Sequence, residues 1–172
     1  MTKRLYTAAL AQGLLVALLT VTPAFGHGGP GGRGMMMHDP GQGADMQLFH
    51  QLFEHRADIT RKVIAREDGI ETVTESTNPE VARLLQAHVA SMLARVKEGR
   101  PIHQRDPLFV ELFKNADQIA VTHERTAGGV RIIETSKDAY VVKLLHAHAE
   151  VVSAFLANGM SEMMKNHPVP PR

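Results

Sequence analysis

The chain has 172 residues, a formal net charge of +1 at pH 7 and no cysteine. The near-zero charge gives no electrostatic case for nucleic acid as a partner. The absence of cysteine excludes disulfides, thiolate zinc sites, iron–sulfur clusters, blue-copper ligation and covalently attached c-type haem. The length remaining after a leader suits one compact domain, or two fused halves that share a core.

Residues 1–26 have the three-part pattern of a secretory signal peptide. Two basic residues precede an apolar run over residues 10–21, which is followed by a proline and small residues. That run is too short to span a membrane. We expect cleavage after Gly26, which would leave His27 at the new N-terminus, or alternatively after Ala24. The sequence therefore predicts a periplasmic or secreted protein with no membrane segment once the leader is removed.

Residues 27–44 form a segment rich in glycine, methionine and histidine that has no apolar periodicity. Such a segment cannot bury a core, so we expect it to be flexible. Methionine and histidine gather at both ends of the mature chain: His27, Met35, Met36, Met37 and His38, then Met160, Met163, Met164 and His167. Thioethers suit Cu(I), and imidazoles suit copper in either oxidation state. The flanks therefore favour copper, although they could equally be low-complexity tails that bind nothing.

The chain contains one segment twice, at a constant offset of 60 residues. Residues 48–99 align without a gap with residues 108–159, with 14 identities in 52 positions. A period of this length implies one supersecondary unit made twice, with each copy burying its apolar face against the other. Among the identities, the one ionisable pair is His88 and His148.

The first repeat, residues 45–99, has the signals of an αββα unit. The predicted elements are a helix over about 46–57, strands at 59–66 and 70–75, and a helix from about 79 to 97. Asp45 is placed to cap the first helix, and Asp68-Gly69 is a strong hairpin signal between the strands. Gly99 is typical of a helix end.

Residues 100–107 connect the repeats, and the second repeat, residues 108–160, follows the same order. Its predicted elements are a helix at 108–117, a strand near 119–125, a turn at Gly128-Gly129, a strand at 130–135, and a helix that is capped by Ser136 or Asp138 and ends at Gly159. A polar, proline-rich tail, residues 161–172, follows. We predict an α+β fold in which two tandem αββα repeats form one pseudo-two-fold domain, with a four-stranded antiparallel sheet covered by helices.

The retained histidines fall on the apolar stripes of the two long predicted helices. On a helical wheel, His88 and His148 face inward, whereas His146 faces outward and is predicted to be exposed. Met92 lies one turn after His88 and would add a thioether on the same side. His123 stands on a predicted strand where the first repeat has an apolar residue.

Two inward-facing imidazoles, with a thioether or a third imidazole, suit copper or the axial positions of a non-covalently held haem. We predict an exported protein that binds a transition metal, copper first, for sequestration, delivery or redox partnership, with a periplasmic redox or metal-transfer protein as the candidate partner. The candidate metal ligands are His88, His148, Met92, His123 and His27. The alternatives are a haem-binding or electron-transfer accessory protein, and a small-molecule-binding or partner-binding domain whose histidines are core residues held by carboxylates or backbone carbonyls.

The sequence offers less support for catalysis. It contains no Gly-x-Ser-x-Gly motif, no phosphate-binding glycine loop and no cysteine nucleophile. Four glutamates at strand or turn positions could each pair with a histidine: Glu71, Glu75, Glu124 and Glu134. Charged residues on a half-exposed sheet are more often simply solvated. We therefore expect a binding protein rather than an enzyme.

Parts of both repeats resemble other exported proteins. The stretches that carry the resemblance are 69–76, 79–81, 86–89, 99–102 with 105–109, and 134–136 with 146–149. They resemble a family of exported bacterial proteins with a duplicated αββα domain, which sometimes lies beside cytochrome c modules. The resemblance implies export, the duplicated fold and a redox or metal context, and it supplies no catalytic residues.

Overall fold

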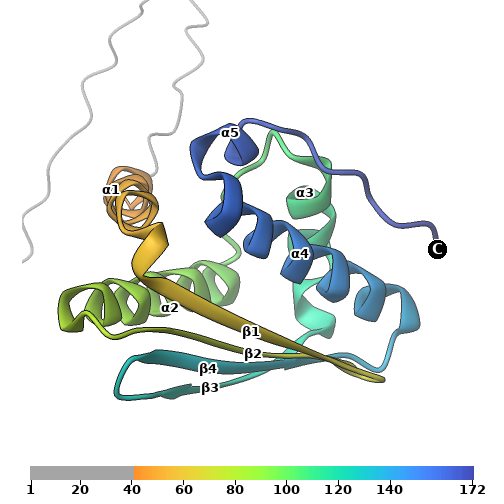
Figure 1. Cartoon of the computed structure of the whole chain (residues 1–172). Helices are drawn as coiled ribbons and strands as arrows, with labels where there is room; N and C mark the ends of the chain where they lie inside the picture. Colours follow the sequence, from red (N-terminus) through yellow and green to blue (C-terminus); the bar gives the residue numbers. More distant parts are fainter. Residues whose placement is uncertain (1–40) are drawn as a thin grey trace, which may run out of the picture. The chain divides into compact units, whose positions relative to one another are not determined.

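A computed structural model describes residues 41–172 (Figure 1). The predicted signal peptide, His27 and most of the predicted flexible segment lie outside these described residues.

The described residues form an α+β fold, as predicted. The helices are α1 (Gln42–Glu54), α2 (Pro79–Glu98), α3 (Pro107–Lys114), α4 (Ala139–Asn158) and α5 (Met160–Met163), and the strands are β1 (Ile59–Arg66), β2 (Gly69–Ser76), β3 (Ala120–Arg125) and β4 (Gly129–Thr135). Short 3-10 turns, Arg56–Asp58 and Ala116–Gln118, precede β1 and β3. The four strands form one antiparallel sheet in the order β1-β2-β4-β3. The helices lie over one face of this sheet (Figure 1).

Side chains alternate between the two faces of the sheet, as the pleat requires. Along β2, Ile70, Thr72 and Thr74 are buried beneath the helices, whereas the residues between them are half-buried. On the other face, Arg131 contacts Glu71 at 2.9 Å and Glu124 at 3.8 Å. On that face, Arg131 therefore joins two of the glutamates, Glu71 and Glu124, rather than leaving both simply solvated.

Elements of the same type recur 60 residues apart in the structure. Helix α2 covers residues 79–98 and α4 covers 139–158, while β2 begins at Gly69 and β4 at Gly129. β2 and β4 pair so that Thr72 lies opposite Ile132, which is its counterpart in the alignment. One pair of aligned positions, Thr72 and Ile132, therefore lies face to face at the centre of the sheet.

The ends of the long helices agree with the sequence signals. The Asn78 side chain accepts a hydrogen bond from the Glu80 amide at 3.0 Å, so Asn78 caps α2. Gly99 ends α2 with a left-handed φ of 63°, which glycine adopts without steric cost. Of the two candidates for the α4 cap, Asp138 takes the role by accepting from the Tyr140 amide at 2.7 Å.

Asp45 does not cap the first helix, so that prediction is wrong. Helix α1 begins at Gln42, and Asp45 lies inside it with only 3% of its surface exposed. Its carboxylate accepts hydrogen bonds from Ser91 Oγ and Arg95 Nε of α2. A short acidic residue before an apolar run is typical of a helix cap. In the structure this residue is buried and links α1 to α2 through its hydrogen bonds.

Helix α4 is the central helix of the core. Val141, Leu144 and Leu145 have no exposed surface, and α4 packs against β2 and α3. Among the described helices, α4 is also the one long and apolar enough, by length and composition, to cross a membrane. Its packing against the sheet is that of a core helix in a folded domain.

The residues after α4 pack onto the domain. Met163 of α5 is buried in the same core cluster as Phe155. Further along, His167 Nδ1 lies 2.5 Å from Asp106 Oδ2, and the Arg172 guanidinium lies 4.2 Å from the centre of the Tyr140 ring. The C-terminal segment is therefore held by α3 and α4 rather than extending freely from them.

One identity between the aligned segments is the glycine pair Gly69 and Gly129, which allows β2 and β4 to pair closely. A Cβ atom on Gly129 would lie 2.2 Å from the Thr74 carbonyl oxygen, and one on Gly69 would lie 1.9 Å from the Glu134 carbonyl oxygen. Because both obstacles are backbone atoms, the strands must separate to accept a side chain. We expect Gly129→Ala to lower the free energy of unfolding by about 1–3 kcal/mol in urea denaturation.

Gly43→Ala is the matched control for this substitution. Gly43 lies within α1, and a Cβ there meets nothing within 4 Å. Alanine should stabilise the helix by up to about 1 kcal/mol. If Gly129→Ala were as harmless as Gly43→Ala, the close pairing of β2 and β4 would not be what requires glycine.

Candidate functional site

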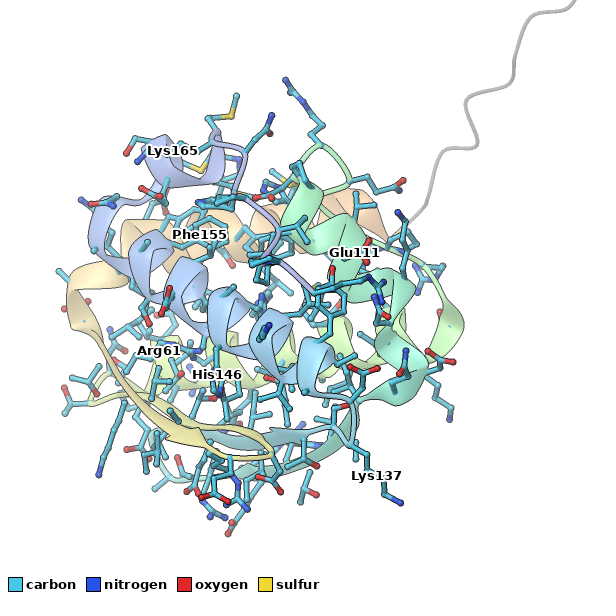
Figure 2. All side chains as sticks on the ribbon, turned by 90° about the vertical axis from the view of Figure 1, so that its right-hand side faces the viewer. Arg61, Glu111, Lys137, His146, Phe155 and Lys165 are labelled. Atoms are coloured by element: carbon cyan, nitrogen blue, oxygen red, sulfur yellow. The ribbon has the colours of Figure 1, made fainter. Side chains whose placement is uncertain are left out.

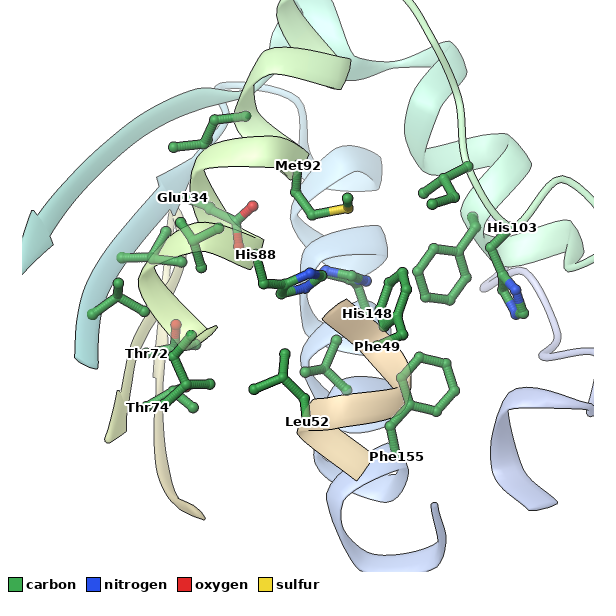
Figure 3. Close-up of a pocket in the computed structure, with 18 of the residues that line it drawn as sticks. Phe49, Leu52, Thr72, Thr74, His88, Met92, His103, Glu134, His148 and Phe155 are labelled. Atoms are coloured by element: carbon green, nitrogen blue, oxygen red, sulfur yellow. The ribbon is translucent and has the colours of Figure 1, made fainter. Parts of the chain in front are cut away.

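A largely apolar cavity of about 240 Å³ lies between the sheet and the helices (Figure 3). Its apolar lining includes Phe49, Leu52, Val89, Phe109, Ile132 and Phe155, contributed by α1, α2, α3, α4 and β4. The polar groups that also line the cavity are therefore held in surroundings with little water to solvate them.

The structure brings three of the predicted metal ligands together in this cavity. His88 and Met92 line it from α2, and His148 lines it from α4. Figure 3 shows the two imidazoles at the centre of the cavity, with the Met92 side chain extending toward them. Both residues are half-buried, because their rings face the cavity, and the charge of His88 contributes to lowering the pKa of His148.

Each imidazole packs in a T-shaped contact with a phenylalanine ring. The ring centres of Phe49 and His88 are 4.7 Å apart, and those of Phe109 and His148 are 5.2 Å apart. Phe49 and Phe109 are 60 residues apart, as are the two histidines. The same aromatic contact therefore positions both imidazoles.

The Nδ1 atoms of His88 and His148 are buried and have no hydrogen-bond partner within residues 41–172. A core histidine of purely structural role would be satisfied there by a carboxylate or a backbone carbonyl. Leaving a buried polar atom unpaired costs about 1–3 kcal/mol. Two such atoms in one cavity call for an explanation, and a bound ligand is one.

Burial lowers the pKa of both histidines to about 4. For His88 the Asp45 carboxylate opposes this effect, and for His148 the positive charge of Arg61 adds to it. Both imidazoles are therefore neutral at pH 7. Neutral imidazole is the form that coordinates metals, so a metal ion would not have to displace a proton from either ring.

One end of the cavity carries a buried cation and a buried acid. Arg61 of β1 donates from Nη1 to Thr74 Oγ1 at 2.8 Å, while its Nε is buried without a partner. Burial lowers the pKa of Arg61 and raises the pKa of Glu134, and the charge of each residue opposes the shift of the other. Of the four glutamates singled out from the sequence, Glu134 is the one that lines this cavity.

The other two predicted metal ligands are not brought to the cavity. His123 lies on β3 opposite Ile132, but it is exposed and does not line the cavity. β3 is an edge strand, so a side chain can point to the helical side of the sheet and still extend beyond the helices. His27 lies outside the described residues.

The methionines and histidine of the C-terminal flank do not converge. Met163 is buried in the core, whereas Met160 and Met164 are exposed. Both nitrogens of His167 face carboxylates, with Nδ1 2.5 Å from Asp106 and Nε2 3.2 Å from Glu162. These contacts give this flank a structural role.

The prediction that His146 is exposed is wrong. Its Nε2 atom lies 2.8 Å from the Gly69 carbonyl oxygen, and the side chain is half-buried (Figure 2). The β1–β2 turn reaches the side of α4 that the wheel assigned to solvent. A helical wheel ranks the faces of one helix but does not show that a second element covers the polar face.

Sequence reasoning missed His103, which lies in the connector between α2 and α3 and lines the cavity. Its φ of 57° is in the left-handed region, which non-glycine residues seldom adopt. The ring packs against Phe109 at 4.9 Å, and Nε2 lies 3.6 Å from Asp106 Oδ2. Burial lowers the pKa of His103, against the opposing charge of Asp106.

Within the described part of the chain, no group of three or more histidine, aspartate or glutamate side chains is arranged to hold a metal ion. The three predicted metal ligands that line the cavity, two imidazoles and a thioether, are a different kind of set. No family model matches this chain, and no curated protein or solved structure is significantly similar to it.

Proposed function

We propose that this is an exported protein that binds copper as Cu(I), through His88, His148 and Met92. The observation that carries the proposal is the pair of neutral imidazoles whose buried Nδ1 atoms lack partners. These rings share an apolar cavity with a thioether that lies one helical turn from His88.

The chemistry of these donors favours Cu(I). Thioether sulfur is a soft ligand that selects Cu(I), and imidazole binds copper well. A monovalent ion also costs less than a divalent ion to transfer into a cavity with apolar walls. The donor set lacks the carboxylates and carbonyls that magnesium or calcium would require.

A duplication of the αββα unit would explain why the two histidines occupy equivalent positions. The two αββα units would be copies related by a pseudo-two-fold axis through the Thr72–Ile132 pair, with one histidine from each copy. The 60-residue spacing of the elements, the register of β2 with β4 and the two phenylalanine–histidine contacts support this arrangement. Duplication of a single ancestral histidine would then have produced a two-imidazole site.

In this proposal the protein sequesters or delivers copper, or exchanges electrons, in the periplasm, with a redox or metal-transfer protein as partner. A free His27 terminus would be a second, separate chelator, using its amine and ring.

Copper binding is tested by thermal unfolding of the mature chain with and without Cu(I) under reducing conditions. A ligand present at 100 times its Kd stabilises the native state by about 2.7 kcal/mol. We therefore expect Cu(I) to raise Tm by several degrees. His88→Leu/His148→Leu should lose most of that increase and still fold, because leucine fills a similar volume and removes the unpaired Nδ1 atoms.

His50→Ala/His123→Ala is the matched control, since it removes two exposed imidazoles and should keep the full increase. Deletion of residues 27–40 should also keep it. Loss of the increase on that deletion, together with its retention in the leucine variant, would place copper binding in the flank. A Soret absorption band in protein isolated from the periplasm would assign the two histidines to haem instead.

A further inference from the structure

We infer that the cavity also binds a small organic molecule, namely a two-ring aromatic compound that carries one hydroxyl group. The hydroxyl would lie between Arg61 and Glu134, and the rings would pack against the apolar walls. This inference does not depend on copper, because its polar contacts are Arg61 and Glu134 rather than the His88, His148 and Met92 donors.

The size of the cavity sets the size of the ligand. An apolar cavity of about 150 Å³ stays dry and binds benzene, which has six non-hydrogen atoms. At about 240 Å³ this cavity is larger by more than half. In proportion, it takes roughly ten non-hydrogen atoms, which is the size of two fused rings. Phe49, Phe109 and Phe155 provide aromatic surfaces against which such rings pack.

The polar groups of the cavity that lack hydrogen-bond partners determine which functional group the ligand carries. Arg61 Nε is a buried donor without a partner, although Nη1 of the same side chain is satisfied by Thr74. The charge of Arg61 acts to lower the pKa of Glu134. No ion pair within 4.0 Å joins the two side chains in the described chain. A hydroxyl group both accepts and donates a hydrogen bond. One hydroxyl could therefore accept from Arg61 and donate to Glu134.

The cavity adjoins a second hollow near the end of α2. Val96, Phe113 and Ala116 line the cavity and also line a hollow of about 230 Å³ that reaches Pro101 and Val110. Val96 is 37% exposed. An apolar molecule could thus enter between α2 and α3 without unfolding the core.

The test compares 2-naphthol with naphthalene as probes, using the mature chain freed of metal by a chelator. The protein contains no tryptophan, so the fluorescence of either probe can be followed directly. We expect saturable binding of both probes, with 2-naphthol about tenfold tighter because its hydroxyl pairs with a charged donor. Arg61→Met should abolish that tenfold preference and keep naphthalene binding. Arg83→Met, an exposed arginine on α2, should change neither affinity.

Val152→Phe places a larger side chain in the cavity lining and should abolish binding of both probes, while circular dichroism reports an intact fold. Three results would overturn the inference: no saturable binding to the wild-type chain, a 2-naphthol preference that survives Arg61→Met, or binding that survives Val152→Phe. Because copper is absent throughout, these results are separate from the copper-dependent Tm. Either proposal can fail while the other stands.

Discussion

Asp45→Ala should lower the free energy of unfolding by about 3–5 kcal/mol, since removing one partner of a buried ion pair leaves the other charge uncompensated. The Asp45 and Arg95 side chains are 4% and 1% exposed, and Arg95 donates from Nε to the Asp45 carboxylate. The substitution also removes the acceptor for Ser91 Oγ. Urea denaturation at pH 7 measures the loss.

Asp68→Ala is the control for this prediction. Asp68 also pairs with an arginine, Arg66, at 3.0 Å, but both side chains are substantially exposed. An exposed pair contributes about 0–1 kcal/mol, so this substitution should have little effect. Similar losses for Asp45→Ala and Asp68→Ala would show that burial of the Asp45 pair does not govern its contribution.

The Asp45–Arg95 ion pair also affects the position of the cavity residues Phe49 and His88. Helix α1 carries Phe49, whose ring contacts His88, and the Asp45–Arg95 pair fastens α1 to α2. A loosened α1 would free the His88 ring. Asp45→Ala should therefore reduce the increase in Tm caused by Cu(I) as well as the stability of the metal-free chain.

The elements could be predicted because their signals are local. β-branched runs on either side of Asp68-Gly69 indicate a hairpin, and the β1–β2 hairpin is present. Pro79 and Gly99 mark the ends of α2 by backbone preferences that do not depend on the rest of the chain. The inward direction of His88 and His148 follows from helical periodicity in the same way.

The polar end of the cavity could not be predicted, because it is made by distant segments. Arg61 and Glu134 lie on β1 and β4, which are separated by β2 in the sheet. Strand alternation assigns Glu134 to one face, but it does not show which helices cover that face or where they leave space. His103 was missed for a similar reason: it lies in a connector, and its position depends on a backbone angle that has no sequence signal.

The sequence predicts a tail over residues 161–172 because this segment is polar and rich in proline. Its attachment depends instead on single polar contacts with Asp106, which has no exposed surface. Asp106 caps α3 by accepting from the Leu108 amide at 3.0 Å, and it also accepts from the His167 amide at 3.1 Å. One buried carboxylate thus joins the connector, α3 and the end of the chain.

Asp106→Ala should cost about 3–5 kcal/mol in unfolding free energy, because it removes a helix cap and leaves His167 without its buried partner. Asp138→Ala, which removes the exposed cap of α4, should cost about 1 kcal/mol. Equal losses from the two substitutions would show that Asp106 acts as a cap alone. Urea denaturation at pH 6 measures both.

The part of this stability that comes from His167 should depend on pH. Burial acts to lower the pKa of His167, but hydrogen bonds to Asp106 and Glu162 outweigh it and raise the pKa above its ordinary value of 6.5. A group whose pKa is raised by folding stabilises the native state fully below its unfolded pKa. That contribution is lost as pH rises through the folded pKa. The difference in unfolding free energy between the wild type and His167→Ala should therefore be largest below pH 6.5 and should shrink toward pH 9.

The measurement compares the wild type with His167→Ala because His88 and His148 have the opposite effect on the pH dependence of stability. Burial lowers the pKa of His88 and His148 to about 4, so acidification below 6.5 favours the unfolded chain at those two sites. Both proteins contain them, and the subtraction removes their effect. A difference that stays constant or grows as pH rises would mean that the imidazolium of His167 does not hold the C-terminal segment to Asp106.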